Sequence, residues 1–146
     1  MSRELNEACA RALGYTTLWA EDSAFGPSLY LHDAGAIRES ESVTANCHLL
    51  GARWERLRVD GEVGEYFVRL CPAFSENHEA ARLLEDEIER RGLWGVYLTA
   101  LIKLLNIHGD RTWFDWDREW VHAVAIMLRA TPEQRARAFL EAVANA

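Results

Sequence analysis

Lysine is almost absent from this chain: Lys103 is the only one among 16 basic residues, and all the others are arginines. Acidic residues outnumber basic ones, 23 to 16, so the net charge is −7. Direct binding to duplex nucleic acid needs a basic face that pairs with phosphates, and the acidic balance argues against it and against anionic membranes. The arginines that are present suit bidentate contacts with phosphate or carboxylate groups.

Cysteine is scarce and unevenly spaced, at Cys9, Cys47 and Cys71. An odd number with long spacings does not form a disulfide framework, and without a Cys-x-x-Cys pair we expect no structural zinc site. No apolar run is as long as a membrane span, and the N-terminus lacks a basic-then-apolar signal pattern. We therefore expect a cytoplasmic protein with reduced thiols and no membrane partner.

Familiar catalytic motifs are also missing. The sequence has no Gly-x-Ser-x-Gly elbow, no Gly-x-x-x-x-Gly-Lys-Ser/Thr loop, no Gly-x-Gly-x-x-Gly and no His-Glu-x-x-His. The acidic run at residues 85–87 is no metal cluster, because successive side chains of a helix point in different directions, and we expect a solvated face there. We predict a protein that is not an enzyme and has no cofactor and no metal site.

The chain is long enough for a single domain, residues 1–146, with a core that needs no disulfide or metal. Apolar periodicity predicts a helix at residues 3–13, with Ser2 as its N-cap and Gly14 as its stop. Residues 33–46 are polar and show no clear period, so they receive no assignment.

Strands are predicted at residues 15–20 and 28–32, and a β-hairpin at residues 53–70. The hairpin is the clearest β signal, because two β-rich runs flank Asp60-Gly61, a pair that suits the positive φ angles of a tight turn. Gly64 is expected to mark a bulge.

Alternation along the hairpin separates an apolar face from a charged one. Leu57 and Val59 share the apolar face, and Arg56 and Arg58 fall on the opposite face. Cross-strand ion pairs with glutamates would explain these arginines without any ligand. The alternative is a guanidinium-rich outer face that receives a phosphate-bearing ligand.

The second half of the chain begins with a predicted helix at residues 75–91. Residues 93–107 are nearly all apolar and fit a helix or a strand; we favour a strand, followed by another at residues 120–128. The last helix is well marked, because Thr131, Pro132 and Gln134 form a Thr-x-x-Gln capping box with proline at the first position.

Three sequence motifs lie at the start, middle and end of the chain. They are Arg3-Glu4-Leu5-Asn6 leading to Gly14-Tyr15, then Pro72-Ala73-Phe74-Ser75, and finally Ala130-Thr131-Pro132-Glu133-Gln134. In this order they resemble the small phage proteins with the phage ABA-sandwich domain. The resemblance implies a phage or prophage origin and no particular reaction. With the element order, it leads us to predict an α+β fold, a three-layer α-β-α sandwich with a mostly antiparallel sheet flanked by helices.

The most unusual segment is residues 110–120, which is rich in both aromatic and charged side chains. Such a mixture forms hot spots for protein partners, and it can also stack a nucleobase and pair its phosphate with arginine. The alternative is core packing of alternate rings. The candidate binding residues are Arg111, Trp113, Phe114, Asp115, Trp116, Asp117, Arg118 and Trp120.

The absence of catalytic motifs favours a binding protein. The resemblance to phage proteins then implies the leading hypothesis, a steric, anti-CRISPR-like inhibitor of a host protein or ribonucleoprotein complex that acts against host defence. The alternative is a sponge or receptor for a small signalling nucleotide, and an unrecognised hydrolase is less favoured. A homo-oligomer is left open.

Overall fold

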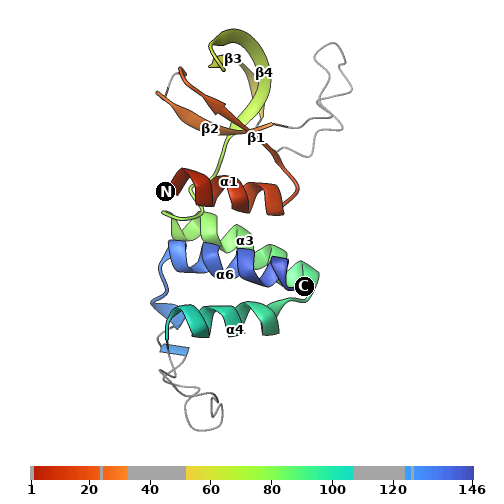
Figure 1. Ribbon diagram of the computed structural model, residues 1–146, viewed down its shortest axis with the longest axis vertical. Coiled ribbons are helices and arrows are strands. Elements are labelled where there is room, and N and C mark those ends of the chain that lie inside the picture. The colour runs from red at the N-terminus through yellow and green to blue at the C-terminus, as the bar shows by residue number, and fades with distance from the viewer. Residues whose placement is uncertain (1, 24, 33–51, 107–123, 126) are drawn as a thin grey trace. The chain divides into compact units, whose positions relative to one another are not determined.

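The computed structural model describes residues 2–23, 25–32, 52–106, 124–125 and 127–146 (Figure 1). Over these residues the protein combines α-helices with a four-stranded antiparallel sheet, which confirms the predicted α+β class. Two compact units divide the chain: a β unit, Ala10–Pro72, and a helical unit, Met1–Cys9 with Ala73–Ala146. The boundary falls inside helix α1 (Ser2–Ala12). The single domain and the three-layer arrangement stay predictions.

The sheet of the β unit has the order β1-β2-β4-β3. Its strands are β1 (Thr16–Ala20), β2 (Ser28–His32), β3 (Arg53–Val59) and β4 (Glu62–Leu70). Every neighbouring pair is antiparallel. The strand predicted at residues 28–32 and the hairpin are therefore confirmed, and the first strand begins one residue later than predicted.

The turn between β3 and β4 has the predicted chemistry. Asp60 and Gly61 have φ angles of 51° and 80°, the positive values that an Asp-Gly hairpin turn requires. The bulge predicted at Gly64 is wrong, because Gly64 pairs in regular register with Leu57. A Cβ atom on Gly64 would lie 3.2 Å from the ring of Tyr66, so the glycine leaves room for that ring.

The two edge strands of the sheet approach each other, so the sheet curls into a partly closed barrel. β1 contacts β3, and an isolated antiparallel bridge joins Asp22 to Arg58. The backbone N–H of Glu21 donates to the carbonyl oxygen of Arg58 at 2.8 Å. Figure 1 shows the curvature of the β3–β4 hairpin. The inner face holds the core, in which Ala20, Tyr30, Leu57 and Val68 are buried and Leu18, Val59 and Tyr66 pack against them.

The helical unit contains α3 (His78–Arg91), α4 (Trp94–Leu104) and α6 (Pro132–Ala144). Helix α6 packs against both α3 and α4. The side chains buried on these helices include Leu84, Ile88, Tyr97, Leu101 and Phe139.

Capping side chains set where two of these helices begin. The predicted capping box of α6 is confirmed: Gln134 N–H donates to Thr131 Oγ1 at 3.1 Å, and Thr131 N–H donates to Gln134 Oε1 at 2.9 Å. The predicted start of α3 at Ser75 is wrong. Asn77 is the N-cap, because its Oδ1 accepts from the backbone N–H groups of Glu79 and Ala80.

Two predicted strands are helical where the structure describes them. Residues 93–107 were expected to form a strand, and α4 occupies most of that range. Residues 124–125 and 127–128 are helical, so the strand predicted at residues 120–128 is wrong over that part. Apolar residues such as Trp94, Val96 and Leu104 also lie on the exposed side of α4, so the segment lacks the polar positions that would have revealed a 3.6-residue period.

Candidate functional site

The binding segment that we predicted from its aromatic and charged residues lies outside the residues that the structure describes. It comprises Arg111, Trp113, Phe114, Asp115, Trp116, Asp117, Arg118 and Trp120. Its assignment as a partner surface or as core stays a prediction. The candidate site described below comes from other residues, in the β unit.

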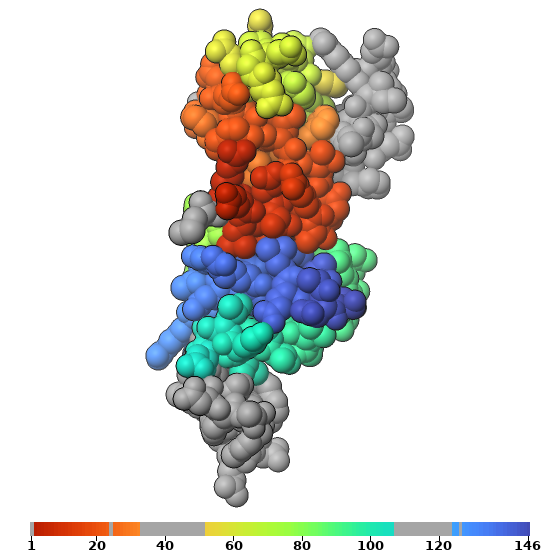
Figure 2. All heavy atoms as spheres, in the orientation of Figure 1, coloured from red at the N-terminus to blue at the C-terminus, as the bar shows by residue number. Residues whose placement is uncertain are grey.

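The outer face of β3 carries exposed, charged side chains. Strand alternation sends Leu57 and Val59 into the core and turns Arg56 and Arg58 outward, as the sequence predicted. Both arginines are exposed. In Figure 2 the atoms of the β3–β4 hairpin, yellow to yellow-green, lie on the visible surface of the β unit.

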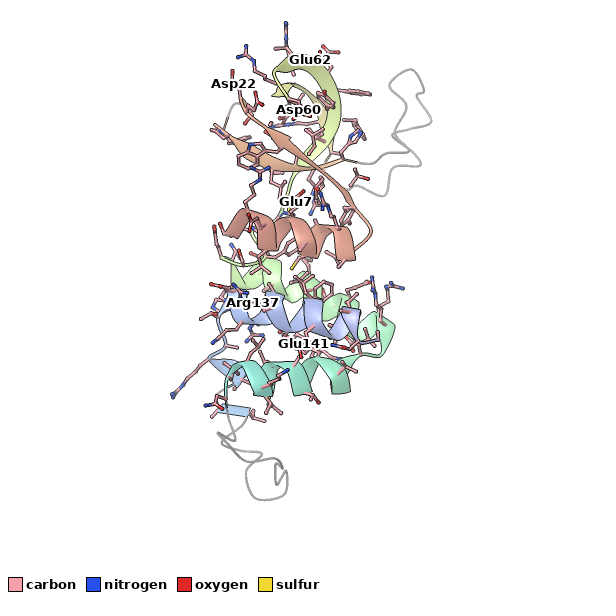
Figure 3. The ribbon with its side chains drawn as sticks, in the orientation of Figure 1. Glu7, Asp22, Asp60, Glu62, Arg137 and Glu141 are labelled. Carbon is pink, nitrogen blue, oxygen red and sulfur yellow. The ribbon has the colours of Figure 1, made fainter. Side chains whose placement is uncertain are left out.

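A pocket of ≈ 280 Å³ lies where β3 meets the end of β1. It is lined by Asp22, Ser23, Arg56, Leu57, Arg58 and Val63. The closure of the barrel positions it, because the bridge between Asp22 and Arg58 brings the chain that follows β1 against β3. Figure 3 shows Asp22 at the end of the β unit that also carries Asp60 of the hairpin turn.

The walls of this pocket are held by hydrogen bonds in the turn after β1. Ser23 Oγ donates to the carbonyl oxygen of Gly26 at 2.6 Å and accepts from the N–H of Phe25 at 3.2 Å. These bonds fix the Ser23 side chain in a compact turn. The pocket wall on this side is therefore set before any ligand arrives.

The charges on β3 are only partly paired. Arg53, on the inner face of β3, forms an ion pair with Glu55, with Nε and Oε1 2.6 Å apart. Within the described ranges, the guanidinium groups of Arg56 and Arg58 have no hydrogen bond or ion pair, so the cross-strand pairs expected for them are not formed there. With the carboxylate of Asp22, the pocket carries a formal charge of +1, which favours an anionic group.

A buried tyrosine lies beside the pocket. Tyr30 is fully buried, and its hydroxyl has no hydrogen-bond partner within the described part of the chain, although Ser23 and Glu55 are near it. Burial raises the pKa of this phenol, so Tyr30 stays neutral. A neutral hydroxyl in the barrel interior supplies no base or nucleophile at ordinary pH.

The helical unit contains a separate polar cluster that joins α3, α4 and α6. Glu85 on α3 forms an ion pair with Arg135 on α6, and the hydroxyl of Tyr97 on α4 donates to Glu85 Oε1 at 2.8 Å. Burial and the neighbouring Glu85 carboxylate raise the pKa of Tyr97, so its proton stays in place as a donor. Glu85 was predicted to lie on a solvated face; that prediction is wrong, because the side chain is mostly buried in this cluster.

A second pocket, of ≈ 350 Å³, lies between α4 and α6. Gly95, Val96, Thr99, Ala100, Glu141 and Asn145 line it. Its walls are mostly small or apolar, and its charged wall residue, Glu141, lies 3.5 Å from Lys103 (Nζ to Oε1). The pocket on β3 is the stronger candidate, because it combines two guanidinium groups whose charge a ligand could neutralise.

The described ranges contain neither a cluster of metal-ligating side chains nor a membrane-spanning helix. No group of three or more His, Cys, Asp or Glu side chains there could hold a metal ion. No helix among those residues is long and apolar enough to cross a membrane. The absence of a metal from the whole protein stays a prediction.

Comparison with protein-family models, with curated proteins and with solved structures gave no match. The resemblance to the phage ABA-sandwich domain therefore stays a prediction, and function must be inferred from the chain's own residues.

Sequence reasoning found part of the β3 site and missed the rest. Period-two alternation around Leu57 was enough to place Arg56 and Arg58 on the outer face. Asp22 and Ser23 were missed, because they join the site through the closure of the barrel, a long-range contact with no local sequence signal. Trp54 lies on the same face as the two arginines and could have been found by the same alternation.

Proposed function

We propose that this chain is a non-catalytic binding protein whose pocket on β3 holds a phosphate-bearing small molecule. The observation that carries the proposal is the pair of guanidinium groups, Arg56 and Arg58, that line the pocket without a side-chain partner among the described residues. Arginine presents a planar fork of N–H donors that matches phosphate oxygens. This is the alternative function considered in the sequence analysis, a ligand sponge or receptor. It uses Arg56 and Arg58, which the sequence also suggested for a phosphate-bearing ligand, rather than residues 110–120.

Two adjacent guanidinium groups favour phosphate over carboxylate. A carboxylate is satisfied by one bidentate arginine, whereas a tetrahedral phosphate presents further oxygens to a second fork. Asp22 opposes this binding, because its carboxylate lines the same pocket and repels an anion. Because one carboxylate opposes two guanidinium groups, we expect the site to bind its ligand reversibly and with modest affinity.

Titration with pyrophosphate tests the proposal. Isothermal calorimetry on the full chain is expected to show binding, and pyrophosphate is expected to raise the melting temperature by mass action. Arg56→Gln and Arg58→Gln each remove one charged fork and are expected to weaken binding at least about tenfold. Asp22→Asn removes the opposing charge and is expected to strengthen it about fivefold, since two unit charges about 4 Å apart interact by ~1 kcal/mol where water fully screens them.

The matched control is Arg82→Gln. Arg82 is an exposed arginine on α3 without a side-chain partner among the described residues, so its loss changes the net charge equally. Pyrophosphate affinity is expected to be unchanged in this variant. Equal losses in Arg82→Gln and Arg56→Gln would show that the total charge, and not the pocket, attracts the anion.

Steric inhibition of a host protein or ribonucleoprotein complex remains a second proposal. The net charge of −7 favours it, because an acidic surface can occupy a basic groove that normally binds nucleic acid. In this proposal the protein acts in the cytoplasm of an infected bacterial host, with residues 110–120 as its anchor. The two proposals use different residues, so substitutions in each segment separate them.

A further inference from the structure

An exposed tryptophan extends the arginine-lined face of β3. Trp54 lies two positions before Arg56 on the same strand, so Trp54, Arg56 and Arg58 all point outward from one face. Neighbouring side chains on one face of a strand are roughly 6.6 Å apart along it. Trp54 is 43% exposed, which is unusual for a side chain of this size. The strand therefore presents an aromatic surface followed by two cations in a row.

The indole of Trp54 is held in place by a neighbour on the adjacent strand. Trp54 and Phe67 are direct cross-strand partners in β3 and β4. Their ring centroids lie 5.4 Å apart, with planes inclined by 46°. Phe67 is itself buried, so it forms a firm support. A ring braced in this way loses little conformational freedom when a ligand stacks on it.

We infer that the ligand of this site is a free nucleotide, whose base stacks on Trp54 and whose phosphates pair with Arg56 and Arg58. This inference rests on the proposed function and adds a nucleobase to the phosphate-bearing ligand. In a nucleotide one sugar separates a flat base from its phosphates, and β3 offers an aromatic ring and then guanidinium groups in that order. Stacking on an aromatic side chain accepts every base, so the site selects nucleotides as a class.

The charge of the chain favours a free nucleotide over a strand of nucleic acid. A polyanion brings many phosphates near a protein with a net charge of −7, and a mononucleotide brings few. A single-stranded oligonucleotide offers the same base and phosphate chemistry, so it is included in the test as the competing source.

Calorimetric titrations of the full chain with ADP, ribose 5-phosphate and pyrophosphate test the inference. ADP is expected to bind most tightly. Trp54→Ala is expected to weaken ADP binding on the order of tenfold and to leave pyrophosphate binding unchanged. Trp54→Phe keeps an aromatic surface and is expected to retain most of the ADP affinity, which also covers the case in which the alanine variant fails to fold.

A spectroscopic measurement and a matched variant complete the test. ADP is expected to shift the indole N–H signal of Trp54 in ¹H–¹⁵N spectra, and Trp54→Phe identifies that signal by its loss. Trp94→Ala is the control, because Trp94 lies on α4 in the helical unit and is 39% exposed, close to the value for Trp54. Its ADP affinity is expected to equal that of the original protein.

The outcomes separate the inference from the proposed function. Equal affinities for ADP and pyrophosphate, with both dependent on Arg56, would overturn the nucleotide inference and leave the phosphate site standing. If the original protein bound neither pyrophosphate nor ADP, both the nucleotide inference and the proposed function would be overturned. A third outcome is that a four-nucleotide oligodeoxyadenylate binds more tightly than ADP, with an affinity that falls steeply as the salt concentration rises. That result would assign the site to single-stranded nucleic acid.

Discussion

Two buried tyrosines of this protein differ in what their hydroxyl groups contact. The hydroxyl of Tyr97 donates to the Glu85 carboxylate, whereas that of Tyr30 has no hydrogen-bond partner among the described residues. A buried hydroxyl without a partner costs stability, and a hydrogen bond to a charged group adds to it. The same chemical group therefore has opposite effects in the two units.

Removing each hydroxyl tests this contrast. Tyr30→Phe is expected to increase the free energy of unfolding by about 1 kcal/mol, because it removes an unsatisfied polar group. Tyr97→Phe is expected to decrease it by about 1.5 kcal/mol, because it removes a hydrogen bond to a carboxylate. Urea unfolding of the two variants measures both changes, and a loss of stability in Tyr30→Phe would show that its hydroxyl has a partner in solution.

At the scale of the element, helix α3 carries a carboxylate held by two arginines. Glu87 pairs with Arg90 and Arg91, and the Arg91 Nε to Glu87 Oε1 distance is 2.6 Å. The hydrogen bond from Arg90 is the main reason that the pKa of Glu87 falls from 4.5 to about 2. Glu87 and Arg91 are four residues apart, the spacing that brings a glutamate and a following arginine together on one face of a helix.

The lowered pKa makes the stability of α3 depend on pH. A folded-state pKa below the unfolded value gives stability that is complete above pH 4.5 and is lost as the pH falls towards 2. Glu87→Gln is expected to reduce the free energy of unfolding at pH 7, with about 0.3–0.5 kcal/mol from the pair with Arg91. That difference from the original protein is expected to shrink steadily below pH 4.5 in urea unfolding.

Glu89→Gln is the matched control for this prediction. Glu89 is an exposed glutamate on the same helix, and its side chain has no partner among the described residues. A pH-dependent loss as large as that of Glu87→Gln would attribute the effect to helix charge in general and contradict the role of the arginine pair.

The elements of this fold were predictable where local signals were strong. Alternation and the Asp60-Gly61 turn located the β3–β4 hairpin, and the Thr131 capping box located the start of α6. Helix α4 was mistaken for a strand, because its nearly unbroken apolar run contains Trp94, Val96 and Thr99, which favour strands. The packing of α4 against α6 outweighs these strand preferences. Tertiary contacts of that kind cannot be recognised from the sequence of one segment.

Only those residues of the candidate site that lie on β3 were predictable from the sequence. Arg56 and Arg58 follow from the strand period, but Asp22 enters the site through the bridge to Arg58, which depends on how the whole sheet curls. The segment first predicted to bind, residues 110–120, was chosen for its composition, and composition alone does not separate a surface from a core.

At the scale of the whole molecule, the two proposed functions predict different phenotypes. If the chain inhibits a host complex through residues 110–120, Trp113→Ala or Trp116→Ala is expected to abolish inhibition and leave the melting temperature nearly unchanged. An inhibition assay with thermal melting in parallel measures both effects. A large fall in melting temperature would show instead that these rings belong to the core.

Arg56→Gln is the complementary variant for this assay. It is expected to remove phosphate binding and leave steric inhibition intact, since it lies in a different segment. Loss of inhibition in Arg56→Gln alone would show that the effect on the host depends on the bound small molecule.

The bridge that closes the barrel also governs when the site can exist. Asp22 and Arg58 are far apart in the sequence. Bringing such residues together costs loop-closure entropy, so contacts of this kind form late in folding. A chain with only the β3–β4 hairpin formed would display Arg56 and Arg58 without the wall that Asp22 and Ser23 provide. The pocket is therefore a property of the completed barrel, and its ligand would stabilise the last stage of assembly rather than the first.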